Sequence, residues 1–382
     1  MTRVDPAQVD DFRAGLRRFV SREIAPHVDA WDEAGAFPRE LYRRAAQLGL
    51  LGLGYPEAYG GTPCDLATRL VAVEEIAQAG SGGLLAGLFS HHIALPPLLA
   101  AGSAGLRQRV IPPVLAGEAV AALAVTEPGG GSDVAHLATT ARRDGDHYVI
   151  EGEKVFITTG MRADWLTVAV RTGGPGAGGI SLLAVPGDAP RLSRTPLKKM
   201  GWWCSDTAHL RFDGVRVPAG HLIGDEHAGF RLIMENFNGE RLVLAAGAVA
   251  FAQVAHDEAL DWARQRRTFG RTLAGHQVIR HRLMDMRMRI AASRAFLHDV
   301  TRRLDAAGHA ADAEAVADLC LLKNHATQTL QWCADAAVQI LGGMGYMRGT
   351  KSERIYREVK VLAIGGGADE IMKELAARQL RI

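Results

Sequence analysis

The sequence predicts an α+β fold in three consecutive parts: a helical domain, a β-sheet domain and a helical bundle. The prediction rests on the spacing of apolar residues along the 382-residue chain. Apolar side chains recur three and four residues apart up to about Gly117, alternate between about Ala121 and Gly224, and return to helical spacing after Asp225. Helices and half-buried sheets each need a partner layer, so two helical domains should flank the sheet. We expect domains at residues 1–120, 121–225 and 226–382.

The first domain shows amphipathic helical segments. "VDDFRAGLRRFVSREI" places apolar side chains three and four residues apart, and "PRELYRRAAQLGLLGL" repeats the pattern from Pro38. Charged residues fill the opposite faces of both segments. The pattern predicts helices that bury one side and expose the other.

The middle domain shows alternation with a period of two. Four strands are expected, at "HYVIEGEKVFIT" (147–158), "WLTVAV" (165–170), "ISLLAV" (180–185) and "AHLRFDGVRV" (208–217). Turn sequences such as "RDGD" and "GGPGAGG" separate them. An antiparallel sheet is the expected arrangement.

The last domain is expected to be a bundle of long helices. Helical periodicity covers roughly residues 228–264, 276–307, 313–341 and 369–380. Three consecutive glycines, "GGG" at 365–367, come directly before the last helix, and a glycine run implies a need for unusual backbone conformation or for empty space.

Composition excludes several classes of protein. The 44 basic and 42 acidic residues nearly cancel, so bulk charge favours neither nucleic acid nor membrane as a partner. The N-terminus lacks the apolar core of a signal peptide, and no apolar stretch reaches about 18 residues. We expect a cytoplasmic protein. The cysteines lack CxxC spacing and are expected to be buried free thiols, with no zinc or other metal site: Cys64, Cys204, Cys320 and Cys333.

Two segments of the middle domain could bind a ligand. "AVTEPGGGSDVA" (124–135) follows a strand with a glycine-rich loop whose backbone N–H groups suit phosphate oxygens or the edge of a flavin ring. By spacing alone a plain turn is the more common explanation, since glycine clusters after strands are more often turns than ligand sites. "VFITTG" (155–160) offers an aromatic ring and two threonine hydroxyls, although Phe156 could simply pack into the core at a strand end.

Two further segments lie in the last domain. "RQRRTFG" (264–270) ends a long helix with several cations, which offset the negative helix C-terminus or bind a pyrophosphate. "QILGGMGYM" (339–347) is typical of a helix C-cap.

Taken in order, these segments resemble the acyl-CoA dehydrogenase family. "KMGWWCSDTAHLRFDGVRVP" (199–218) and "GGGADEIMKELAARQL" (365–380) extend the resemblance, which covers nearly the whole chain. The resemblance implies an N-terminal α-helical domain, a middle β-barrel domain and a C-terminal four-helix bundle, as the periodicities suggested independently.

The resemblance also implies FAD, held between the middle domain and the bundle and completed by a neighbouring subunit. A homotetramer, or at least a dimer, is therefore expected. Many relatives carry tryptophan at the Phe156 position, so stacking would be kept while one N–H donor is lost. The matching cofactor-binding positions are Leu123, Thr126, Gly131, Ser132, Phe156 and Thr158, and, from the neighbouring subunit, Arg266, Thr268, Phe269, Gln339, Gly342 and Gly343.

The family removes an α proton from an acyl thioester with a carboxylate base. Many relatives carry this base in a Tyr-Glu-Gly-Thr stretch before the last helix, where this chain has Gly365 and Gly366 instead. The isovaleryl-CoA and long-chain branches likewise have glycine there and place the base on an earlier helix, in a Glu-Arg-Leu run. That run matches Glu240, Arg241 and Leu242. Without the resemblance, Glu240 would be read as a solvated helix glutamate.

We therefore expect Glu240 to be the base, in the space that Gly365 and Gly366 leave free, and the Gly366 N–H to bind the thioester carbonyl. Glu235, five residues earlier, should face elsewhere on the helix. Asn238, Arg241 and Gly367 are assigned to substrate binding, although Arg241 could equally be a structural ion-pair partner.

The expected activity is FAD-dependent α,β-dehydrogenation of an acyl-CoA with a branched or bulky acyl group. An electron-transferring flavoprotein would be the external oxidant. Two alternatives remain: a dehydrogenase or oxidase of acyl groups on a carrier protein, and a non-catalytic flavoprotein of the same fold. The near-neutral charge argues against DNA-associated members of the family.

Overall fold

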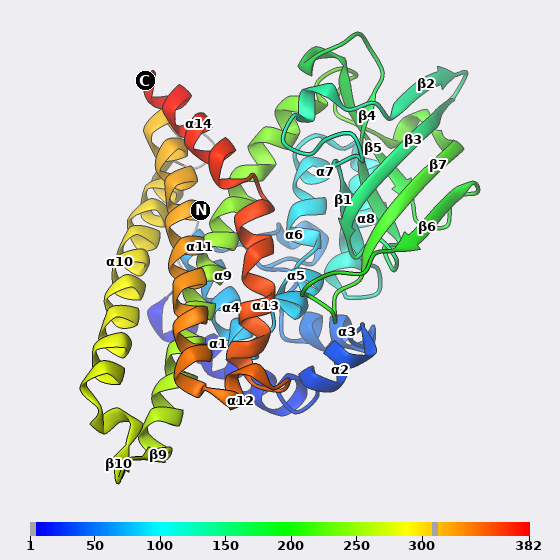
Figure 1. Cartoon of the computed structure of the whole chain (residues 1–382). Helices are drawn as coiled ribbons and strands as arrows, with labels where there is room; N and C mark the ends of the chain where they lie inside the picture. The colour runs from blue at the N-terminus through cyan, green and yellow to red at the C-terminus, as the bar shows by residue number, and fades with distance from the viewer. Residues whose placement is uncertain (1–4, 308–311) are drawn as a thin grey trace.

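A computed structural model describes residues 5–307 and 312–382 and confirms the three-part α+β fold (Figure 1). Helices come first, an eight-stranded sheet follows, and long helices end the chain. Residues 1–4 of the expected first domain and 308–311 of the expected last domain lie outside the described residues.

The N-terminal helices begin at polar caps. The Asp5, Asp65 and Ser103 side chains each accept a hydrogen bond from a backbone N–H in the first turn that follows them. The second expected helix ends early, at Gln47, because Gly49 adopts a φ of +72°. The helices are α1 (Pro6–Phe19), α2 (Val28–Ala34), α3 (Glu40–Gln47), α4 (Leu66–Ala77), α5 (Gly82–Leu88), α6 (His91–Ala94), α7 (Pro96–Ala101) and α8 (Ala104–Leu115).

The middle sheet has the order β6-β7-β3-β2-β4-β5-β8, and β1 pairs in parallel with β4. The expected strands correspond to β3, β4, β5 and β7, whereas the other four are short. The pairings form an open path from β6 to β8. The strands are β1 (Ala121–Ala124), β2 (Thr140–Asp144), β3 (His147–Thr158), β4 (Trp165–Arg171), β5 (Ile180–Pro186), β6 (Leu192–Pro196), β7 (Thr207–Pro218) and β8 (Leu222–Ile223).

The described part of the C-terminal bundle contains two helices that the periodicity did not predict, the four-residue α12 (Gly343–Tyr346) and the longer α13 (Lys351–Ile364). Helix α13 carries the buried charged residues Glu353, Arg354 and Glu358, which interrupt its apolar pattern. The other elements are α9 (Gly229–Gln265), β9 (Arg267–Thr268), β10 (Arg271–Thr272), α10 (Gln277–Ala307), α11 (Ala313–Leu341) and α14 (Asp369–Leu380).

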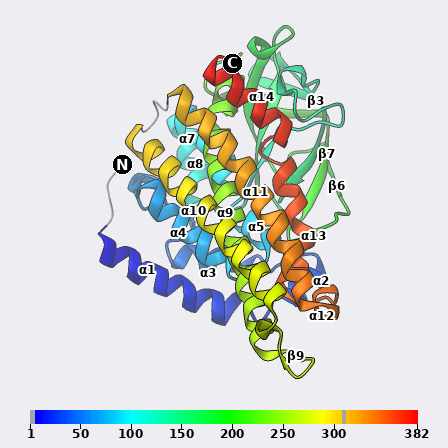
Figure 2. The same cartoon turned by 60° about the vertical axis from the view of Figure 1, so that its left-hand side comes forward.

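The largest apolar core joins the first and last domains. It includes buried side chains of α4, α9, α10, α11 and α13, and Figure 2 shows the long helices α9, α10 and α11 running side by side. All four cysteines are free and buried, as expected. Within the described residues, no single helix is long and apolar enough to cross a membrane; only the bent pair 82–88 and 91–101 meets that length and composition, and it is largely buried in the protein.

Candidate active site

Glu240 on α9 lies beside Gly366 in the turn between α13 and α14. A Cβ built on Gly366 would be 3.8 Å from Glu240 Oε1 and 2.5 Å from Leu244 Cδ1. Gly365 differs, because a Cβ there would meet only the Val361 carbonyl oxygen, at 3.3 Å. The space that Glu240 borders is therefore that of Gly366 rather than that of Gly365.

The Glu240 carboxyl has a base-like electrostatic environment. Burial raises its pKa to about 7, while the positive charges of Arg241 and Lys323 act in the opposite direction. No ion pair or hydrogen bond to this carboxyl occurs in the part of the chain that the structure describes. Glu235 is exposed and pairs with Arg231 at 3.0 Å, so it faces away as expected. A carboxylate with a pKa near 7 suits proton abstraction at neutral pH.

The turn at 366–367 requires glycine on conformational grounds. Gly366 has a φ of +67° and Gly367 a φ of +110°. A Cβ on Gly367 would overlap Met372 Cε. No hydrogen bond within the described residues uses the Gly366 N–H, so this donor is free to bind a carbonyl.

Asn238, Arg241 and Gly367, which are assigned to substrate binding, lie close together. Gly367 is part of the turn, Arg241 donates a hydrogen bond to it, and Asn238 accepts one from Arg241. Arg241 is buried; its Nε donates to the Gly366 carbonyl at 3.2 Å and its guanidinium donates to Asn238 Oδ1 at 3.0 Å. Arg241 makes no ion pair with any residue that the structure describes, so the ion-pair alternative is not observed. The Gly367 carbonyl accepts from Lys323 Nζ at 2.6 Å.

A buried ion pair holds the glycine-rich loop. Lys154 Nζ donates to Glu127 Oε1 at 2.7 Å and to the Val125 carbonyl at 2.9 Å. The Glu127 carboxylate also accepts from the backbone N–H groups of Ala138 and Thr139, at 2.5 and 2.9 Å. The pair thus joins both ends of the loop to β3, while the loop itself, with Gly131 and Ser132, remains exposed.

Phe156 projects into solvent from the end of β3. Its side chain is 69% exposed and its φ is +62°, next to a register shift between Lys154 and Ile157. The Val155 N–H donates to the Thr126 carbonyl at 2.9 Å, which joins this strand end to the glycine-rich loop. The core-packing alternative for Phe156 is therefore wrong. An exposed aromatic ring beside a loop of exposed backbone N–H groups fits a flavin ring and its phosphates.

The six residues that are expected to contact FAD from a neighbouring subunit lie far from Phe156 and the glycine-rich loop. Arg266, Thr268 and Phe269 belong to the turn between α9 and α10, and Gln339, Gly342 and Gly343 to the junction of α11 and α12. Both segments lie at the end of the bundle away from the sheet (Figure 1). Phe269 is 96% exposed. One chain therefore does not bring the two groups of residues together.

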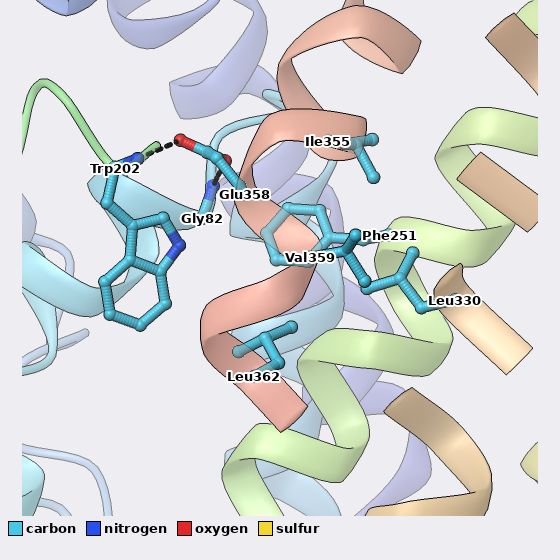
Figure 3. Close-up of a pocket in the computed structure, with 8 residues that line it drawn as sticks. All are labelled: Gly82, Trp202, Phe251, Leu330, Ile355, Glu358, Val359 and Leu362. Carbon is cyan, nitrogen blue, oxygen red and sulfur yellow. Dashed lines mark hydrogen bonds between the residues drawn. The ribbon is translucent and has the colours of Figure 1, made fainter. Parts of the chain in front are cut away.

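Another buried carboxyl, that of Glu358, is not part of the expected site. Figure 3 shows its side chain pointing away from Phe251 and Leu330 at a small pocket lined by residues of α5, α9, α11 and α13 and by Trp202. Glu358 accepts from the backbone N–H groups of Gly82 at 2.6 Å and Trp202 at 3.0 Å. Burial raises its pKa to about 7. Its partners are backbone groups of the other two domains, so it connects the three domains.

Sequence reasoning missed Lys154 and Lys323. Each is fully buried and donates to a backbone carbonyl. The signal available in the sequence was weak: a lysine inside an apolar segment, "KVFIT" for Lys154 and "LCLLKNHA" for Lys323. No group of three or more potential metal ligands is present among residues 5–307 and 312–382.

Comparison with protein families matches all three parts of the chain. The acyl-CoA dehydrogenase N-terminal, middle and C-terminal domains match residues 6–118, 122–215 and 227–381. The rat (Rattus norvegicus) long-chain specific acyl-CoA dehydrogenase is 36% identical over 388 residues, covering 99% of this chain and 87% of that protein.

A second similar protein and a solved structure point to the same family. Cyclohexane-1-carbonyl-CoA dehydrogenase of Geobacter metallireducens is 36% identical over 368 residues, covering 96% of this chain and 95% of that protein. The crystal structure of acyl-CoA dehydrogenase from Geobacillus kaustophilus is 35% identical, covers 100% of both chains and superposes with a TM-score of 0.94. The chain belongs to the acyl-CoA dehydrogenase family, whose members are FAD-dependent oxidoreductases acting on the CH–CH group of acyl-CoA.

Proposed function

We propose that Glu240 is the catalytic base of this acyl-CoA dehydrogenase and that the Gly366 N–H stabilises the enolate that forms when the α proton leaves. The observation that carries the proposal is the position of the Glu240 carboxyl beside Gly366, in surroundings that raise its pKa to about 7. A base at this position replaces the carboxylate that many relatives carry where this chain has Gly366.

The chain's own residues supply the proton-transfer half of the reaction. Glu240 takes the α proton of the thioester, and the negative charge that develops on the thioester carbonyl is stabilised by the Gly366 N–H. One such donor is typically worth about 3 kcal/mol in the transition state. Bound FAD supplies the acceptor for the β hydrogen, which leaves as hydride. Phe156, Thr158 and the glycine-rich loop would hold the FAD.

The proposed substrate class is a branched or otherwise bulky acyl-CoA. Gly365 stands where many relatives carry a tyrosine, and no side chain among the described residues lies within 4 Å of a Cβ on Gly365, whereas Leu244 fills the space at Gly366. A cyclic acyl group is named for one relative, the cyclohexane-1-carbonyl-CoA dehydrogenase. The missing tyrosine side chain enlarges the space next to the reacting carbons and so favours substituents there.

A homo-oligomer, with a tetramer as the expected form, would complete the flavin site. Phe269 and Gln339 are exposed at the far end of the bundle, which suits contact with a cofactor on another chain. Because each turnover removes two electrons from the substrate, an external acceptor is required, and an electron-transferring flavoprotein is the proposed partner.

The base assignment is tested by exchange of the α proton. The FAD-loaded enzyme is mixed anaerobically with a panel of straight and branched acyl-CoAs in D2O, and deuterium uptake and flavin bleaching are both followed. Glu240→Gln should lose at least about 100-fold in both rates, whereas Glu235→Gln, on the same helix but exposed, should match the unmodified enzyme. Full exchange by Glu240→Gln would refute the assignment. No bleaching with any thioester would favour a non-catalytic flavoprotein.

A further inference from the structure

Lys323 occupies an unusual position for a lysine. Its side chain comes from the middle of α11, is 0% exposed, and donates from Nζ to the Gly367 carbonyl at 2.6 Å. Burying an ammonium group is costly, so a fully buried lysine normally has a specific partner. Here that partner is a backbone carbonyl of the turn that also carries the Gly366 N–H.

A second cationic side chain, that of Arg241, contacts the same turn. Arg241 Nε, from α9, donates to the carbonyl of Gly366, so two cationic side chains bind two consecutive carbonyls. Holding the peptides on both sides of Gly367 fixes the φ and ψ of Gly367 and anchors the carboxyl side of Gly366. On the other side of Gly366, the Gly365 N–H donates to the Val361 carbonyl at 2.7 Å, so the peptide that carries the Gly366 N–H lies between anchored neighbours. This restraint is needed because glycine has the widest backbone freedom of any residue.

The hydrogen bond of Lys323 is not needed to attach the last helix. The neighbouring Asn324 already donates to the Asp369 carbonyl at 2.8 Å, and Gln328 donates to the Asp369 side chain at 3.1 Å. Both contacts join α11 to the start of α14. The contact of Lys323 lies two residues earlier, on the turn itself.

We propose that Lys323 is a positioning residue for catalysis: by holding the Gly367 carbonyl, it keeps the Gly366 N–H aimed at the substrate carbonyl. The proposal rests on the proposed roles of Glu240 and Gly366. It predicts that Lys323 affects proton abstraction more than substrate binding, because misplacement of a group by about 1 Å can cost 100-fold in rate.

Lys323 also acts electrostatically on the base. The charged groups near it are Glu240 and Arg241 from α9 and Asp369 from α14, with Cys320 one turn away on its own helix. Its positive charge favours the ionised form of Glu240. Removal of this charge should therefore raise the pKa of Glu240 further, and proton abstraction should require a higher pH.

The experiment compares Lys323→Met with Lys351→Met. Lys351 also donates from Nζ to a backbone carbonyl, that of Gln78 at 2.8 Å, but it lies at the opposite end of α13. Deuterium exchange at the acyl-CoA α carbon is measured per bound FAD as a function of pH, together with acyl-CoA affinity and Tm.

Lys323→Met should exchange about 10- to 100-fold more slowly, with acyl-CoA affinity within about threefold and the midpoint of its pH profile shifted upward. Lys351→Met should change at most the Tm. Exchange within twofold of the unmodified enzyme and an unshifted midpoint would overturn the proposal.

Two further measurements keep the result interpretable. If Lys323→Met does not fold, Lys323→Gln, which keeps an N–H donor without the charge, should still shift the midpoint upward, and an unshifted midpoint would count against the proposal. Glu240→Gln is measured in the same assay. Exchange by Glu240→Gln would refute the base assignment, whereas an inactive Glu240→Gln beside an unaffected Lys323→Met would refute only the role of Lys323.

Discussion

Leu244 fills the space into which a side chain at position 366 would project, since a Cβ on Gly366 would lie 2.5 Å from Leu244 Cδ1. Leu244 lies one helical turn after Glu240 on α9, so the proposed base and this leucine border the same glycine. The relationship gives a direct test of why glycine is required at position 366.

Gly366→Ala should lower stability by about 1 to 3 kcal/mol, because it adds a Cβ at a φ of +67° and against Leu244. Leu244→Ala removes the collision but not the backbone cost. In a double-mutant cycle, the two substitutions together should therefore cost less than the sum of the single effects. Strict additivity in chemical denaturation would show that Leu244 does not restrict position 366.

Proton abstraction should depend on pH through Glu240. Because burial raises the pKa of its carboxyl to about 7, the rate should increase about tenfold per pH unit below pH 7 and level off above it. Single-turnover flavin reduction across pH 5.5–9 measures this profile. A rate that is flat between pH 5.5 and 7 would indicate a base with an ordinary carboxyl pKa.

Glu240 should also reduce stability at high pH. Its pKa is higher in the folded protein, about 7, than its usual value of 4.5. Between these values the unfolded chain loses the proton while the folded chain keeps it, so stability falls as pH rises and the full loss is reached above pH 7. We therefore compare the free energy of unfolding of Glu240→Gln with that of the unmodified protein at two pH values. The difference should shift in favour of the variant by about 1 to 3 kcal/mol between pH 5 and pH 8. Glu235→Gln provides the control, and an equal gain in both variants would contradict the argument.

The proposed contact of Phe156 with FAD can be tested separately from folding. Phe156 is largely exposed at positive φ, so Phe156→Gly should leave the stability of the FAD-free protein unchanged or slightly higher. Its FAD affinity should fall about tenfold, as expected for the loss of one aromatic stacking contact. Fluorescence titration measures the affinity. Phe212→Ala, a buried residue of β7, should instead lose about 3 to 5 kcal/mol of stability, and an unchanged FAD affinity in Phe156→Gly would remove this residue from the site.

The glycine-rich loop should depend on its buried ion pair. Lys154→Met leaves the Glu127 carboxylate buried without its cation and should cost about 3 to 5 kcal/mol. Combining it with Glu127→Gln removes the charge as well and should recover part of that loss. Thermal unfolding of the unmodified protein and of these two variants makes the comparison. A double variant less stable than Lys154→Met would mean that hydrogen bonds of Glu127, rather than its charge, hold the loop.

The sequence predicted the order of the domains and the four longest strands of the sheet because periodicity is a local property. It failed at α13, where Arg354 and Glu358 are buried because their partners, Asp29 and the N–H groups of Gly82 and Trp202, lie far away in the chain. Such partners leave no periodic signal in the helix itself.

The candidate site was predictable where two positions constrain each other. A glycine at position 366 pointed to a base elsewhere, and the structure places the proposed base, Glu240, beside that glycine. Lys323 had no comparable signal, because its partner is a carbonyl of Gly367, and every residue type provides a carbonyl. Backbone contacts of this kind become visible only in three dimensions.

The separation of Phe156 from Phe269 within one chain has a genetic consequence. If each flavin is held by Phe156 of one subunit and Phe269 of another, a variant damaged at either residue alone disables every site in its own oligomer. In a mixed oligomer, however, the undamaged halves of the two variants meet and rebuild intact sites. Two inactive proteins, unfolded and refolded together, would then complement each other and recover activity that neither regains when refolded alone.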